Sequence, residues 1–317
     1  MQHGNCSCSP VNKLNLLCFR FQISRLLTLP VKTLFLIILI SPVLTFADTG
    51  DTAHRPPPSS ILFEVGGDDA NTQEYFAALN LGLGGGQRIL FEAGETRLDN
   101  GERSNVKLLR LGFGSDPLKD FSFVSSLQQR QLRDEFRIRS FNQSIALSLH
   151  DWLITATGGF RQISLFPVES ERNRRFNTSN VYSEGWEIAV DYYGLPNWGL
   201  GVAHRRNRYD RELSTFDDTN TSLNNRFSQH TLDIVWGLND QSSLISATYL
   251  FPMAYASVLY TLSESAVDES GYKTASLRLG WDVTYDWTIE GEIGAGYADD
   301  EPDDDITFYS VAVQRRW

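Results

Sequence analysis

The residues of this sequence whose types and spacing could do chemistry are charged side chains. Within their segments they fall on the same one of two alternating faces. The main set is Arg88, Arg110, Arg161, Arg205, Arg278, Glu187, Asp191, Asp233, Asp282, Glu290 and Glu292. Glu64, Glu74 and Glu92 share the same face. Opposite charges on one face can line a water-filled path with a field across it, or they can pair and close a narrow space.

Catalytic and cofactor-binding patterns are weaker. His230 lies two residues from Ser228, but no serine-centred motif and no second ordered polar partner accompanies the pair. The glycine-rich stretch at 82–87 lacks the last glycine of a nucleotide-binding loop. We therefore predict neither an enzyme nor a bound cofactor.

Two clusters of like charge lie between apolar segments. The first is the run of carboxylates from Asp299 to Asp305, which lacks the glycine and the spacing of a calcium hand. A solvated loop is the favoured interpretation, divalent bridging to lipid phosphates is the alternative, and no resident metal site is predicted. The second cluster, Arg172, Arg174 and Arg175, could contact anionic lipopolysaccharide.

The composition differs sharply between the first 47 residues and the rest. Residues 1–47 contain Lys13, Arg20, Arg25 and Lys32, no acidic residue, and all three cysteines of the chain. The whole chain nevertheless carries a net charge of −11, so the remainder is strongly acidic. Nucleic-acid affinity depends on Lys and Arg neutralising phosphates, which excludes nucleic acid as a partner.

The N-terminal region has the three parts of a secretory signal. Basic residues precede the apolar stretch TLFLIILISPVLTFA at 33–47, which ends in a small residue before Asp48. The alternative, a membrane-anchoring helix, needs about 20 apolar residues, and this stretch is shorter and contains Pro42. We predict a signal peptide at 1–47 cleaved near Ala47, a short periplasmic tail at 48–58, and a folded domain at 59–317.

Alternation of apolar and polar residues continues from residue 59 to the end of the chain. This period of two is typical of strands with one apolar face. A soluble sandwich or barrel is one architecture with that pattern, but its strands are usually about 5 to 6 residues long. The segments here are longer, as a tilted membrane crossing requires, and aromatic residues gather at their ends. The prediction is an all-β, transmembrane, antiparallel up-and-down β-barrel.

The breaks between segments predict the number of strands. Longer and shorter breaks largely alternate, and thirteen breaks give 14 strands, with both termini on the periplasmic side. This count includes a strand around Leu232, Ile234 and Trp236, and a single long strand over 244–262 despite Pro252. If Pro252 turns the chain instead, 12 or 16 strands are the alternatives.

The last ten residues, FYSVAVQRRW, resemble the closing strand of bacterial outer-membrane β-barrel proteins. Tyr309, Val311, Val313 and Trp317 match the alternating, aromatic-ended pattern that the barrel-insertion machinery recognises in that family. Arg315 departs from it, because an apolar residue is usual at this outward position. The resemblance implies a barrel in the cell outer membrane, with outer-membrane lipid, lipopolysaccharide and the barrel-assembly machinery as partners.

Two function classes follow from these observations. The first is a passive or gated channel for small hydrophilic solutes, in which the inward charges set the field. The second is a non-conducting barrel that serves as an envelope structural, assembly or surface-binding element, with a lumen filled by paired charges. Alternation alone does not distinguish them.

Overall fold

The computed structural model describes residues 59–69, 71–99, 103–132, 136–165, 179–211, 213, 237–267, 270–299 and 305–317. The predicted signal peptide and tail, residues 1–58, lie outside this part of the chain and remain predictions. None of the helices in the described part is long and apolar enough to span a membrane.

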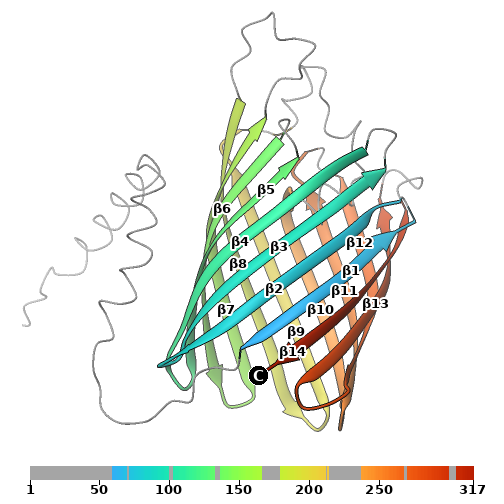
Figure 1. The fold of residues 1–317 in the computed structure, drawn as a ribbon. Coiled ribbons are helices and arrows are strands. Elements are labelled where there is room, and N and C mark those ends of the chain that lie inside the picture. The colour runs from blue at the N-terminus through green and yellow to red at the C-terminus, as the bar shows by residue number, and fades with distance from the viewer. Residues whose placement is uncertain are drawn as a thin grey trace, which may run out of the picture. The chain divides into compact units, whose positions relative to one another are not determined.

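Fourteen antiparallel strands form one closed barrel, as the alternation predicted (Figure 1). The strands are β1 (Ser60–Asp68), β2 (Gln73–Gly84), β3 (Gln87–Asp99), β4 (Arg103–Leu118), β5 (Phe121–Leu132), β6 (Phe136–Leu149), β7 (Trp152–Leu165), β8 (Ser179–Leu195), β9 (Trp198–Tyr209), β10 (Asn239–Phe251), β11 (Ala254–Ser265), β12 (Gly271–Asp282), β13 (Trp287–Ala298) and β14 (Ile306–Arg316). Each strand pairs with its neighbours in the chain.

The barrel closes where the first strand meets the last, which are blue and red in Figure 1. β1 pairs with β14 from Ser60 opposite Arg316 to Asp68 opposite Phe308. Beyond the ladder, Ser59 and Trp317 exchange two backbone hydrogen bonds of 3.0 Å. No strand edge is left exposed, which removes the unpaired backbone groups that a membrane does not tolerate.

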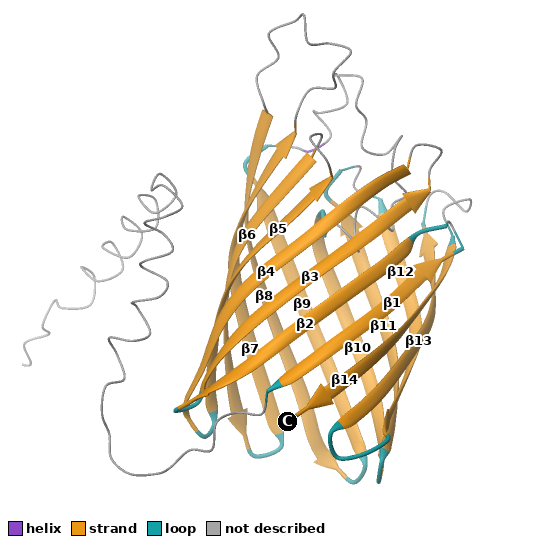
Figure 2. Ribbon diagram, viewed as in Figure 1, coloured by secondary structure: helices purple, strands orange, loops and turns teal. Residues whose placement is uncertain are grey.

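The two ends of the barrel differ in their connections (Figure 2). Short turns join β2 to β3, β4 to β5, β6 to β7, β8 to β9, β10 to β11 and β12 to β13 at the end that also holds Trp317; we call this the turn end. The β2–β3 turn needs glycine, because Gly86 has φ +74° and a Cβ there would lie 2.6 Å from the Asp116 carbonyl oxygen. The opposite end, with the longer connections, is the loop end.

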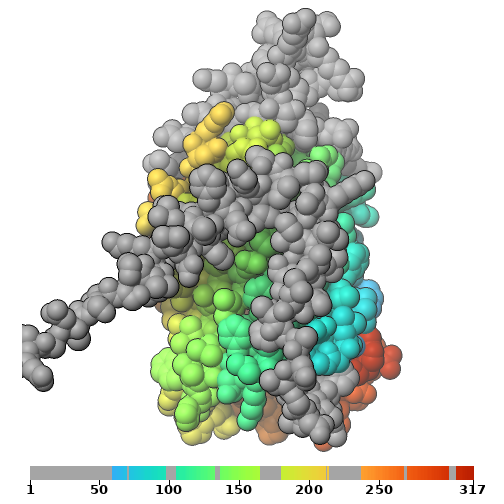
Figure 3. All heavy atoms as spheres, turned by 90° about the vertical axis from the view of Figure 1, so that its left-hand side faces the viewer, coloured from blue at the N-terminus to red at the C-terminus, as the bar shows by residue number. Residues whose placement is uncertain are grey.

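Large apolar side chains cover the outside of the barrel at alternate positions. Val65, Leu109, Val202, Ile245 and Val311 are each between 51% and 58% exposed. Figure 3 shows part of this outer wall. An apolar outer face on every strand fits lipid rather than water as the surrounding medium, so the membrane form of the barrel is favoured over the soluble form.

Aromatic side chains form a girdle at the turn end. Trp152, Trp198, Trp281 and Trp287 each stand within two residues of a turn, and Trp317 ends the chain. Two of these rings pack on tyrosines: Trp152 on Tyr192, with centroids 4.5 Å apart, and Trp198 on Tyr249, at 5.1 Å. Arg315, the exception to the family pattern, lies over the Trp287 ring at 5.5 Å. The Trp287 ring therefore provides a partner for the Arg315 charge at the membrane interface.

The strand count of 14 is correct, but two of the predicted strands are wrong. Pro252 and Met253 form a turn, and the expected single strand over 244–262 is divided between β10 and β11. Proline cannot donate to a ladder and suits a turn, which explains the break. Conversely, β9 pairs directly with β10, so the barrel closes without the strand expected around Leu232, Ile234 and Trp236. Those three residues lie outside the described part of the chain.

An apolar cluster occupies the inside of the barrel near the loop end. Its members are Val106, Leu132, Phe136, Ile138, Ile163, Val181, Leu213, Leu238 and Val267, each at most 7% exposed. Leu213 follows β9 and Leu238 precedes β10, so the two ends of the β9–β10 connection are anchored among inward side chains of β4 to β8. The cluster narrows the lumen on this side.

Deleting Trp317 is expected to slow barrel assembly and to leave a protease-sensitive periplasmic form. The deletion removes both hydrogen bonds to Ser59 and the terminal aromatic residue of the recognised pattern. Pulse-chase labelling with protease challenge in cells measures the delay. Trp281→Ala is the matched control, since it removes a girdle indole and leaves the terminus intact. Equal assembly rates for the deletion and the parent would show that the terminal resemblance is accidental.

Candidate functional site: the charged lumen

The inward charges predicted from alternation occupy positions facing the inside of the barrel. Arg110 lies between the outward residues Leu109 and Leu111, which are 51% and 39% exposed, and the same parity holds for Arg88, Arg161, Arg205, Arg278, Glu187, Asp191, Asp282, Glu290 and Glu292. Asp282 is exposed at the turn end, where its carboxylate accepts a 2.6 Å hydrogen bond from Thr288. Asp233 lies outside the described residues.

Ion pairs inside the barrel join neighbouring strands. Arg110 Nη1 lies 3.2 Å from Glu92 across β3 and β4, and Arg88 Nη1 lies 2.9 Å from Asp116 across the same strands. On the other side of the lumen, Arg278 Nη2 lies 2.7 Å from Glu292 across β12 and β13.

The fourth pair joins Arg205 of β9 to Glu187 of β8, with the arginine Nε 2.6 Å from the carboxylate. The Arg205 and Arg278 side chains retain 40% and 41% of their accessible surface. Among the described residues, these four pairs follow the wall of the barrel and do not cross the lumen.

The charges are unevenly distributed around the wall. Four arginines, Arg110, Arg130, Arg161 and Arg205, lie on β4, β5, β7 and β9. Glu64, Glu74, Glu290 and Glu292 lie on β1, β2 and β13, on the opposite arc of the closed strand order. A low-dielectric wall strengthens the field between such groups relative to bulk water.

Arg130 is a luminal residue that sequence reasoning missed. The set of inward charges predicted from the sequence does not include it, whereas β5 continues to Leu132 and carries Arg130 on its inward side. Apolar and polar residues do not alternate at this end of β5, because the outward Gln129 and Gln131 are polar and the inward Leu132 is apolar, so the sequence pattern contains no signal for Arg130.

The arginines on this arc line a cavity of about 490 Å³ just beneath the apolar cluster. On β5, Arg130 lies two residues closer to the turn end than Leu132 of the cluster. On β7, Arg161 lies two residues closer to the turn end than Ile163. Besides the four arginines, the lining consists mainly of hydroxyl and amide side chains, with Glu187 as the carboxylate. The cavity is thus a polar, predominantly cationic part of the lumen.

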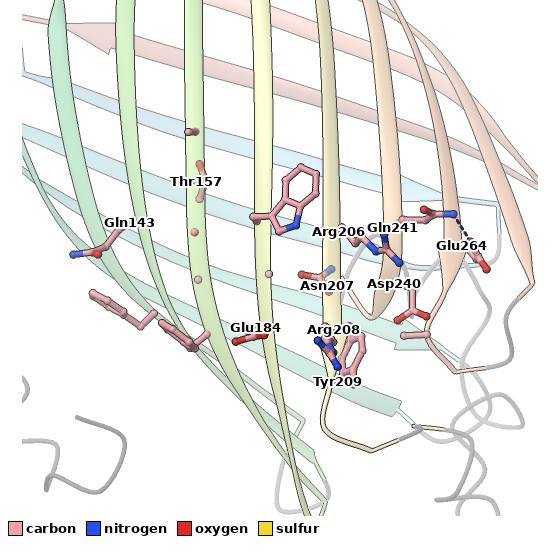
Figure 4. Close-up of a pocket in the computed structure, with 18 of the residues that line it drawn as sticks. Gln143, Thr157, Glu184, Arg206, Asn207, Arg208, Tyr209, Asp240, Gln241 and Glu264 are labelled. Atoms are coloured by element: carbon pink, nitrogen blue, oxygen red, sulfur yellow. Dashed lines mark hydrogen bonds between the residues drawn. The ribbon is translucent and has the colours of Figure 1, made fainter. Parts of the chain in front are cut away.

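The outer wall also carries polar residues, on strands β6 to β11. This outer-wall strip comprises Gln143, Glu184, Arg206, Arg208, Gln241 and Glu264, and Figure 4 shows Gln241 hydrogen-bonded to Glu264. Glu264 and Arg208 lie one residue from the loop end of β11 and β9. The part of the strip on β9, β10 and β11 therefore lies at the loop-end boundary of the apolar band, whereas Gln143 lies at the middle of β6.

One serine-histidine pair is brought together, and it was not the predicted one. His204 Nδ1 lies 2.9 Å from Ser243 Oγ on the outward face, and the imidazole packs on Trp186 with centroids 5.5 Å apart. Within the described residues, no group hydrogen-bonds the second ring nitrogen, so the third member of a catalytic triad is missing. His230 and Ser228 lie outside these residues.

The described part of the chain contains no candidate metal-binding cluster. No group of three or more His, Cys, Asp or Glu side chains there could hold a metal ion. Most of the acidic run from Asp299 to Asp305, and Arg172, Arg174 and Arg175, lie outside the described part, so the interpretations given for both remain predictions.

Comparison with known proteins supports the fold and goes no further. No protein-family model and no curated protein matches the chain. Among solved structures, the CymD monoaromatic hydrocarbon channel aligns with 82% of this chain and 88% of its own at a TM-score of 0.50 and 6% identity. OmpT of Vibrio cholerae covers 86% of this chain and 100% of its own at a TM-score of 0.45 and 9% identity.

A third solved structure, the KdgM porin in complex with disordered oligogalacturonate, covers 81% of this chain and 99% of its own at a TM-score of 0.41 and 10% identity. These proteins are outer-membrane barrels or are named as porins and channels. The closed barrel of 14 strands and the likeness to CymD show that the chain has the fold of an outer-membrane β-barrel protein, which confirms the resemblance seen in its last strand.

Proposed function

We propose that this barrel is a passive channel for small hydrophilic solutes across the outer membrane, with its loop end outside the cell. The observation that carries the proposal is the direction of the luminal ion pairs. Each of the four described pairs joins neighbouring strands along the wall and none of them bridges the lumen, whereas a barrel filled by charge pairs needs bridges from one side to the other.

Partial exposure of the pairs supports the same function. Ion pairs that retain contact with water contribute about 0 to 1 kcal/mol each, while breaking a buried pair costs roughly 3 to 5 kcal/mol. The Arg205 and Arg278 side chains are about two-fifths exposed, so they belong nearer to the first class. The inward arginines and carboxylates are then pore-lining residues that set the field.

Replacing Arg110, Arg161 and Arg278 with glutamine tests the channel against the filled barrel. For a water-filled lumen we expect permeation to shift several-fold toward cations, most clearly at low salt where the Debye length is long, with heat resistance little changed. Reversal potentials in planar bilayers and heat-modifiable gel mobility measure the two properties. Lost heat resistance, with no conductance in parent or variant, would favour the non-conducting barrel.

The remaining partners belong to the same proposal. Arg206 and Arg208 of the outer-wall strip would contact lipopolysaccharide headgroups, and the barrel-assembly machinery would recognise Tyr309, Val311, Val313 and Trp317. Export requires a cleaved signal. N-terminal sequencing of outer-membrane material is expected to find a start near Asp48.

A further inference from the structure

We infer that the cavity beneath the apolar cluster is a binding site for a small organic anion, a polyhydroxy carboxylate of about sugar-acid size. This inference rests on the proposed channel function and specifies the class of solute that the lumen favours.

Two guanidinium groups converge at one point in this cavity. A Cβ atom placed on Gly237 would lie 3.7 Å from Arg161 Nη1 and 3.9 Å from Arg130 Nη1. Arg161 Nη1 donates a hydrogen bond to the Gly237 carbonyl oxygen, which holds this guanidinium at the point of convergence. Like charges brought together in a low-dielectric wall repel one another, and an anion between them relieves that cost.

The local charge balance also favours an anion. Arg110 has its carboxylate in Glu92 and Arg205 has its carboxylate in Glu187, whereas Arg161 hydrogen-bonds the uncharged Gly237 carbonyl and Tyr209 and shares Glu187 with Arg205. Arg130 lies within electrostatic range of three arginines, Arg161, Arg205 and Arg110, against one carboxylate, Glu74. In addition, the buried Nε of Arg110 has no hydrogen-bond partner among the described residues. Arginine forks match carboxylate geometry, which gives the site its preferred ligand group.

The neutral part of the lining fits the hydroxyl groups of such a solute. Its hydroxyl and amide side chains include Gln128, Ser140, Asn142, Ser242 and Thr261. The lining includes one indole residue, Trp186, and its ring packs on the outward His204, so no described aromatic face is offered to a sugar ring. A cavity of about 490 Å³ lies within the usual range for small-molecule sites. Charge and hydroxyl recognition therefore dominate over stacking.

The test compares gluconate with sorbitol, which differ in one terminal group, carboxylate against alcohol. The full mature protein is inserted in planar bilayers, and each solute is titrated while ion current and current noise are recorded. We expect gluconate to interrupt the current at a concentration at least tenfold lower than sorbitol. The double variant Arg130→Gln/Arg161→Gln is expected to abolish that difference.

Two further variants make the result specific to the cavity. Arg206→Gln, on the outward face of β9, removes one charge from the same strand as Arg205 and is expected to keep the full gluconate preference. Arg130→Lys/Arg161→Lys keeps the charges but not the forks, so it should fold even if the glutamine pair does not, and should weaken gluconate block by roughly tenfold.

The possible outcomes of these experiments distinguish failure of the anion site from failure of the channel. A conducting parent that gluconate and sorbitol block equally, or a lysine pair with unchanged gluconate block, would overturn the anion site and leave the channel standing. A correctly assembled parent with no conductance would overturn the channel and the anion site together.

Discussion

Ile245→Arg is expected to destabilise the barrel by about 2 to 4 kcal/mol, the cost of a lipid-facing arginine at the membrane midplane. Ile245 is the central residue of β10, its side chain is 58% exposed, and its register partners Val202 and Tyr260 are also outward. Denaturant unfolding of the protein in lipid vesicles measures the change.

Ser246→Arg, one residue further along β10, is the matched control. Ser246 faces the lumen, and a Cβ atom on the neighbouring Gly201 would lie 2.5 Å from Ser246 Oγ and 2.6 Å from the carboxylate of Asp191. A new arginine there can reach water and an anionic partner, so we expect a change of about 1 kcal/mol or less. Equal costs for the two variants would mean that the outer face does not contact lipid.

Leu238→Ala is expected to cost about 2 to 5 kcal/mol, because it removes a buried side chain and leaves a cavity that packed neighbours only partly fill. Leu238 is 0% exposed in the apolar cluster inside the barrel. Unfolding in vesicles gives the free energy.

Leu262→Ala serves as its control, since Leu262 is an outward residue of β11 with 41% exposure. Acyl chains close around a shortened side chain at that position, so the cavity contribution is absent and the cost should be smaller. If both substitutions cost the same, the cluster is loosely packed and does not anchor the β9–β10 connection.

The alternation of apolar and polar residues was sufficient to predict the class of fold. Lipid outside and water or polar side chains inside impose a period of two on every strand that crosses the membrane. The exposed outward residues Val65, Leu109 and Val311 follow this period. Alternation is a local property, however, and does not reveal which strand pairs with which. The segment around Leu232 and Trp236 has the pattern of a strand, yet β9 and β10 pair without it.

The candidate site was predicted in part for a similar reason. Parity is enough to assign Arg110 or Arg161 to the inside of a barrel. The convergence of Arg130 and Arg161 near Gly237 depends on the shear of the barrel and on the position of Gly237 just before β10. Neither property is encoded by spacing within one strand, so the cavity could not be recognised before the strands were placed in register.

Pairing of β1 with β14 determines when this chain can finish folding. The contact joins residues at opposite ends of the domain, so it has the largest sequence separation in the sheet and requires the greatest loss of chain entropy. Until β14 has paired with it, β1 has no second neighbour, and the open sheet presents an edge that can recruit strands from other molecules. Closure is therefore a late folding event, and a chain whose barrel has not yet closed must be shielded from self-association.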